Sequence, residues 1–83
     1  MTRYFFDFQE GEIAYKDDVG LELSSVAVAR REALEAVAER ARELWSINPH
    51  LPLSVVLRRA DGEQLFEAVA ALELREQTVH SHQ

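Results

Sequence analysis

Acidic side chains are concentrated in the first 22 residues, where their oxygens are the ligands that a hard cation prefers. The six carboxylates are Asp7, Glu10, Glu12, Asp17, Asp18 and Glu22. The segment KDDVGLEL, however, lacks the twelve-residue spacing of a calcium-binding loop. We therefore interpret the carboxylates as a solvated face of strands and turns, and predict neither a metal nor another cofactor.

Arg30 is the basic residue whose position carries the most information. At about 100° per residue it lies about 40° from Val26 on a helical wheel, inside the apolar stripe. A guanidinium at this place must extend to solvent or pair with a carboxylate. One interpretation is an anion-binding site, and the other is a structural ion pair with Asp17 or Asp18 in the turn before the helix. We favour the structural pair.

The residues that could act in catalysis are dispersed along the chain. Covalent hydrolysis needs a nucleophile, a base and an orienting group that converge in a pocket. Ser24 and Ser25 instead precede the helix, where a hydroxyl caps the first turn. His50 lies in a loop, His80 and His82 lie near the C-terminus, and cysteine is absent. We therefore predict that the protein is not an enzyme.

Length and charge narrow the class of protein further. Eighty-three residues are enough for one domain. The net charge of -6, from fifteen acidic and nine basic side chains, disfavours binding to nucleic acid and to anionic membranes. The longest apolar run spans residues 68–72, which is too short for a membrane span. We expect a cytoplasmic protein without a membrane partner.

One segment, residues 24–47, has a sustained helical period and is predicted to be the only helix. Pro49 sets its end, because proline cannot continue the hydrogen-bond ladder. Its apolar stripe and flank comprise Val26, Ala29, Ala33, Leu34, Val37, Ala41, Leu44 and Trp45. An isolated helix of this length is marginal in water, so the stripe must pack on a sheet.

Residues on both sides of this helix alternate between apolar and polar, which predicts strands. The chain start, TRYFFDFQ, and residues 12–16 form one expected hairpin, and residues 53–58 and 64–75 form another around the Asp61–Gly62 turn. The stretch 64–75 is rich in helix-forming residues, but its apolar residues recur at a spacing of two. We favour a strand there, with a second helix as the alternative.

Four short motifs occur in order along the chain: RYFFD at 3–7, Asp18 and Gly20, the A-R-x-E-A unit at 29–33, and Asp61–Gly62. Together they give the chain a resemblance to a family of short bacterial proteins known as a domain of unknown function. It implies a ββαββ domain and implies no activity or cofactor. We accordingly predict an α+β fold over residues 1–75, a four-stranded antiparallel sheet with one helix on one face, followed by a disordered tail over 76–83.

The sheet face turned away from the helix is the predicted functional surface. Five side chains on it are apolar or small where a monomer should be mostly polar. They are Phe5, Val56, Leu65, Val69 and Ala71. We expect a non-enzymatic interaction module that forms a homodimer through sheet faces or strand edges, and an unknown protein partner is also compatible with this surface.

The sequence is also compatible with two other functions. Tyr4, Phe5 and Phe6 could stack on single-stranded nucleic acid while Arg3, Arg58 and Arg59 contact phosphates. A small enzyme using the acidic hairpin and Arg30 would need a deep pocket between helix and sheet.

Overall fold

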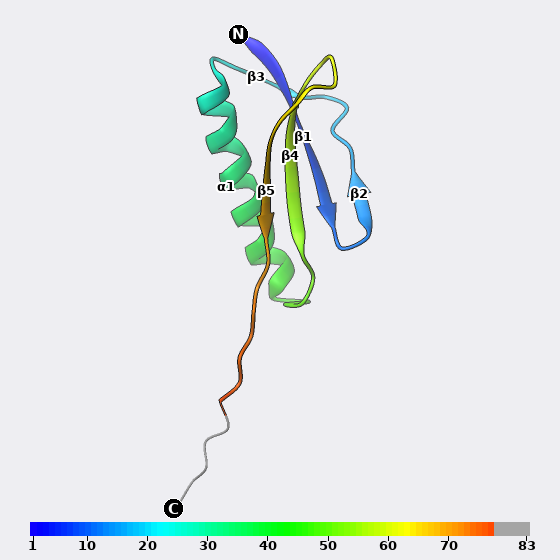
Figure 1. Cartoon of the computed structure of the whole chain (residues 1–83), viewed down its shortest axis with the longest axis vertical. Coiled ribbons are helices and arrows are strands. Elements are labelled where there is room, and N and C mark those ends of the chain that lie inside the picture. The colour runs from blue at the N-terminus through cyan, green and yellow to red at the C-terminus, as the bar shows by residue number, and fades with distance from the viewer. Residues whose placement is uncertain (78–83) are drawn as a thin grey trace, which may run out of the picture.

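The longest strand organises the sheet, because its aromatic residues favour extended backbone and it pairs on both of its edges. The computed structural model describes residues 1–77 and shows the order β2-β1-β4-β5, with β3 also beside β1 (Figure 1). The elements are β1 (Thr2–Glu10), β2 (Ile13–Tyr15), β3 (Leu21–Leu23), α1 (Val26–Trp45), β4 (Leu53–Arg59) and β5 (Gln64–Ala70). All pairings are antiparallel.

The predicted α+β fold, an antiparallel sheet with one helix packed on it, is confirmed. The strand count of four is wrong by one, because the extended piece Leu21–Leu23 pairs with Thr2–Tyr4 as a fifth strand. β2 and β3 share the same edge of β1 and leave a gap between them.

Residues Gln64–Ala70 form a strand and not a second helix. Gly62 supplies the turn with φ +96°, a left-handed conformation that favours glycine. The chain then returns along β4, with Phe66 opposite Leu57 and Ala68 opposite Val55. The strand ends at Ala70, four residues before the end of its apolar alternation. Tertiary pairing has outweighed the local helix propensity here.

Helix α1 begins where the cap was expected. The backbone N–H of Val28 donates to the Ser25 hydroxyl, which satisfies one of the free amides of the first turn. The helix ends at Trp45, before Pro49. Its fully packed side is made of Ala29, Ala33, Val37 and Ala41, spaced by four residues. Small side chains on this side let the helix backbone approach the sheet.

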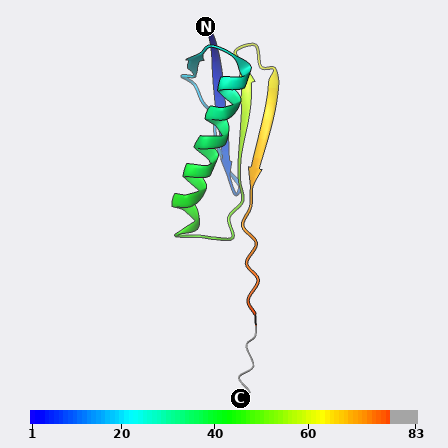
Figure 2. The same ribbon diagram turned by 90° about the vertical axis from the view of Figure 1, so that its left-hand side faces the viewer.

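The core lies between α1 and the β4–β5 half of the sheet. Leu53, Val55 and Leu57 of β4 are almost completely buried under the helix, and Figure 2 shows α1 along one face of the strands. On β1 the helix-facing residues Phe6 and Phe8 remain half-buried. The helix therefore leaves part of the β1–β2 surface accessible.

Beyond β5, residues 71–77 run away from the sheet without regular secondary structure and are exposed (Figure 1). The disordered tail expected over 76–83 lies, from residue 78 onward, outside the described residues. Within the described part of the chain, no helix has both the length and the apolar character that a membrane span requires.

Candidate interaction surface

The centre of the sheet face opposite the helix is polar. Two guanidinium nitrogens of Arg58, Nε and Nη2, donate to the Asp7 carboxylate at 2.6 and 3.3 Å, and Nη2 also donates to the Asp17 carbonyl at 2.9 Å. The Arg58 guanidinium lies 4.7 Å from the centre of the Phe5 ring, within the range of a cation–π contact. The pKa of Arg58 is raised by the hydrogen bond to Asp7. The charged Arg58 guanidinium thus covers the Phe5 ring, which was expected to be part of an apolar interaction surface.

Asp17 closes the gap between β2 and β3. Its carboxylate accepts hydrogen bonds from the backbone N–H groups of Phe6, Val19 and Gly20 at 3.0 to 3.1 Å. Burial raises the pKa of Asp17, but these hydrogen bonds and the charge of Arg58 outweigh it, so the net direction is downward. In the gap between β2 and β3, the Asp17 side chain thereby accepts a backbone hydrogen bond from β1 in place of a paired strand.

The structural pair predicted for Arg30 with Asp17 or Asp18 is wrong: within residues 1–77 no ion pair involves Arg30. Its guanidinium lies 5.1 Å from the centre of the Phe66 ring, on the helix side of the sheet. Asp17 instead lies with Arg58 on the opposite side. The sheet separates the two groups, which a helical wheel cannot reveal.

The five predicted interface residues do not form one patch. A β-bulge between Leu57 and Arg58 shifts the register, and Leu65 packs against the buried cluster of Tyr4, Ala29 and Leu57. Leu65 is therefore half-buried on the helix side, at the border of the core. Of the others, Phe5 and Val56 are half-buried on the outer face, Val69 is exposed on β5, and Ala71 follows the end of that strand.

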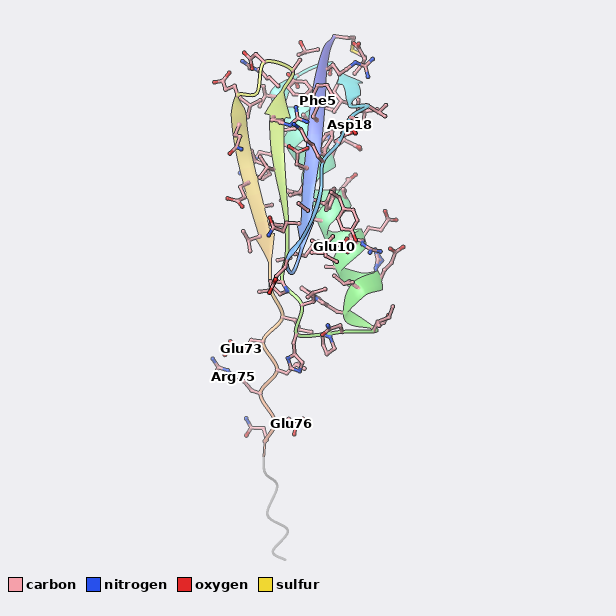
Figure 3. All side chains as sticks on the ribbon, turned by 90° about the vertical axis from the view of Figure 1, so that its right-hand side faces the viewer. Phe5, Glu10, Asp18, Glu73, Arg75 and Glu76 are labelled. Atoms are coloured by element: carbon pink, nitrogen blue, oxygen red, sulfur yellow. The ribbon has the colours of Figure 1, made fainter. Side chains whose placement is uncertain are left out.

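Exposed apolar side chains gather instead along β5 and the residues that follow it. The exposed fractions are 68% for Val69, 39% for Leu72 and 52% for Leu74. Within residues 1–77, no strand pairs with the outer edge of β5. Figure 3 shows Glu73 and Arg75 projecting from this segment, clear of the sheet and the helix. An open edge beside exposed leucines is a ready site for strand addition.

A second feature lies on the helix side of β1. A hollow of about 330 Å³, open to solvent, is lined by Phe8, Glu10, Tyr15 and Arg40. Nε and Nη2 of Arg40 donate to the two oxygens of the buried Glu10 carboxylate, with an Nη2–Oε1 distance of 2.9 Å. The hydrogen bond from Arg40 lowers the pKa of Glu10 against the opposing effect of burial. This pair joins the helix to β1.

The sequence reasoning missed the Glu10–Arg40 pair, although a signal for it exists. Glu10 continues the alternation of Tyr4, Phe6 and Phe8 on the helix-facing side of β1. A carboxylate in that position needs a cation from the helix, and Arg40 lies on the helix flank that faces β1.

The two lowered carboxylate pKa values predict a loss of stability in acid. Each group binds its proton more weakly in the folded chain, so its contribution is complete above the unfolded pKa of about 4 and is lost as the pH falls through the lower native pKa. We expect the free energy of unfolding to be level from about pH 5.5 to 7 and to decrease below about pH 4.5.

Urea unfolding at a series of pH values, at one protein concentration, measures this dependence. Glu10→Gln and Asp17→Asn should each reduce the acid slope, because neither amide titrates. An unchanged free energy of unfolding down to pH 3 would contradict the assignment.

The aromatic residues considered for base stacking do not share a face. Tyr4 is buried against Ala29 and Leu57 under the helix, and Phe6 also lies on the helix side, whereas Phe5 lies on the other face. Arg58 is already paired with Asp7. Among the described residues, no group of three or more metal-ligating side chains lies close enough together to hold a metal ion.

Within the part of the chain that the structure describes, five antiparallel strands with one helix on one face define a small α+β domain. The chain belongs to the family described as Domain of unknown function (DUF6894), whose model matches residues 3–71. No curated protein and no solved structure matches the chain. The matched range covers the helix and, apart from Thr2 at the start of β1, the five strands seen within residues 1–77.

Proposed function

We propose that the protein is a small non-enzymatic interaction module that forms a homodimer through the free edge of its sheet. The observation that carries this proposal is the exposure of Val69, Leu72 and Leu74 along an edge strand and its continuation. Exposed apolar side chains beside unpaired backbone groups favour association by strand addition. The cysteine-free sequence suits a reducing cytoplasm, which we propose as its compartment.

The edge is favoured over the outer sheet face by the charges on that face. A face-to-face dimer would bury the Asp7–Arg58 pair of each copy in the interface. Burying such a pair costs desolvation energy that its attraction repays only with good geometry and additional hydrogen bonds. Edge pairing leaves these groups in contact with water.

The opposite edge is less suited to pairing. There β2 has three residues, and β3 and the Asp17 loop cover the remainder of β1. Short and interrupted edges are the usual means by which proteins prevent strand addition. Strand β5 has seven residues, six of which pair with β4, and the chain runs on beyond it.

Sedimentation velocity over a range of concentrations tests the homodimer. We expect twice the 9.5 kDa chain mass at concentrations well above micromolar, and a shift toward monomer for Val69→Glu. Ile13→Glu is the matched control, because it places the same charge on an exposed apolar residue of β2 at the other edge.

A wild-type chain that stays monomeric throughout this range would refute the homodimer. Equal weakening by both variants would place the contact elsewhere than the β5 edge.

A further inference from the structure

We propose that β5 and residues 71–75 pair antiparallel with the same stretch of a second copy, with Ala71 at the two-fold axis and Glu67 opposite Arg75 of the other copy. This arrangement rests on the proposed homodimer and specifies its register. It joins two sheets into one continuous sheet with both helices on the same side.

The apolar alternation of β5 continues into the residues that follow the strand. Phe66, Ala68 and Ala70 face the helix side, where they pack on the core. Leu72 and Leu74 continue the same spacing of two, but among residues 1–77 both remain exposed. In a β-strand, residues at this spacing share a face. The two leucines therefore extend an apolar strand face that a second copy would cover.

The two-fold symmetry of the dimer restricts which residues of the two copies can lie opposite one another. A two-fold axis that relates antiparallel neighbours is perpendicular to the sheet, so each residue faces a residue from the same side of the sheet. The residue at the axis must then face its own copy. Any residue at the axis keeps the apolar sides of the two strands together, and the end of β5 offers three such centres: Ala70, Ala71 and Leu72.

Charge selects among these three centres. Pairing about Ala70 places Glu67 opposite Glu73, and like charges directly opposite one another are destabilising. Pairing about Leu72 places Arg75 opposite Val69 and Glu73 opposite Ala71, so it forms no opposite-charge pair. Pairing about Ala71 places Glu67 opposite Arg75, which forms two opposite-charge pairs per dimer by symmetry.

Side-chain size supports the same centre. Pairing about Ala71 places Leu74 opposite Ala68 and Leu72 opposite Ala70, so that each large side chain meets a small one. The side of the helix above β5 also has an exposed apolar side chain. Leu34 is 45% exposed and lies one turn after Arg30, whose guanidinium is over the Phe66 ring of β5. The leucines of the second copy would lie beside Leu34.

The arm that supplies Arg75 is available for such a contact. In the single chain Arg75 pairs with Glu73 at 3.1 Å, and both side chains are more than 70% exposed. An exposed pair of this kind contributes little and is readily exchanged. Arg75 can thus contact Glu67 of the second copy without breaking a buried interaction.

Charge reversal in the full chain tests the register by sedimentation equilibrium. Glu67→Arg and Arg75→Glu each give two like-charge pairs per dimer, and we expect each to weaken self-association about ten-fold. The double variant Glu67→Arg/Arg75→Glu should restore the wild-type affinity to within about three-fold. Both residues are exposed, so circular dichroism should show unchanged folding.

Mixing the two single variants gives a sharper readout. One copy of each places opposite charges across both pairs, while each variant alone remains repulsive. We expect the mixture to dimerise as well as the wild type.

The results that would overturn the homodimer differ from those that would overturn only its register. A monomeric wild-type chain overturns the homodimer together with this register. A wild-type dimer that tolerates both single variants, or single-variant defects that neither the double variant nor the mixture repairs, overturns the register alone.

Discussion

Replacement of Leu57 by alanine is expected to lower the free energy of unfolding by about 2 to 5 kcal/mol, the range for removing a buried leucine side chain. Leu57 is fully buried at the centre of β4, where it packs against Tyr4 and Ala29. The loss combines the transfer of apolar carbon atoms to water with the cavity left behind. A domain of this length has a small core, so the variant should be substantially unfolded at 37 °C.

Urea unfolding followed by far-ultraviolet circular dichroism measures this effect. Wild type and variant should be compared at one protein concentration, because self-association adds to apparent stability. Ile47→Ala is the matched control: it also removes a large aliphatic side chain, but from an exposed position after the helix. Its effect should stay within about 0.5 kcal/mol. A loss below about 1 kcal/mol for Leu57→Ala would contradict the central position assigned to β4.

Replacement of Asp17 by alanine is expected to cost about 2 to 4 kcal/mol, because three backbone N–H groups lose a charged acceptor at once. One of these groups, on Phe6, belongs to β1 and lies in the gap between β2 and β3. The other two, on Val19 and Gly20, shape the loop that carries the chain across this gap. Gly20 has φ +77° there, and a Cβ would lie 2.9 Å from the Phe5 ring.

Two variants separate the carboxylate from the chain position. Asp17→Asn keeps one acceptor oxygen, so it should retain part of the stability that alanine loses. Asp18→Ala removes the neighbouring exposed carboxylate and should change the free energy of unfolding by less than about 0.5 kcal/mol. Hydrogen exchange should show faster exchange of the Phe6 amide in Asp17→Ala. Equal effects of Asp17→Ala and Asp18→Ala would refute the bridging role of Asp17.

The predictions that succeeded depend on short-range patterns. The helix was set by its period of 3.6, the serine cap and Pro49, and the second hairpin was set by Asp61–Gly62 together with alternating residues. These signals act within a few residues, so they can be read without knowledge of the fold. The strand at Gln64–Ala70 was the hardest element to predict, because local propensity favoured a helix while the alternation of apolar residues favoured a strand.

The predictions that failed required knowledge of long-range register. A single extra residue opposite Leu57 and Arg58 turned Leu65 from the outer face to the helix side, where it packs half-buried against the core. The same limitation applies to Arg58, which lies fifty-one residues from Asp7 in sequence and donates to it across paired strands. Alternation placed both on one face, but only the register of β1 against β4 brought them into contact.

The sequence by itself determined the helix, four of the five strands, the apolar side of α1, and an α+β fold of the family to which the chain belongs, but not the pairing of Leu21–Leu23 as a strand within residues 1–77. The tertiary structure decided the strand order, the partners of Glu10, Asp17 and Arg58, and the strand edge that remains open. The physical reason is the range of the interactions. Backbone periodicity and capping act over a few residues, whereas ion pairs and sheet edges depend on how distant segments meet.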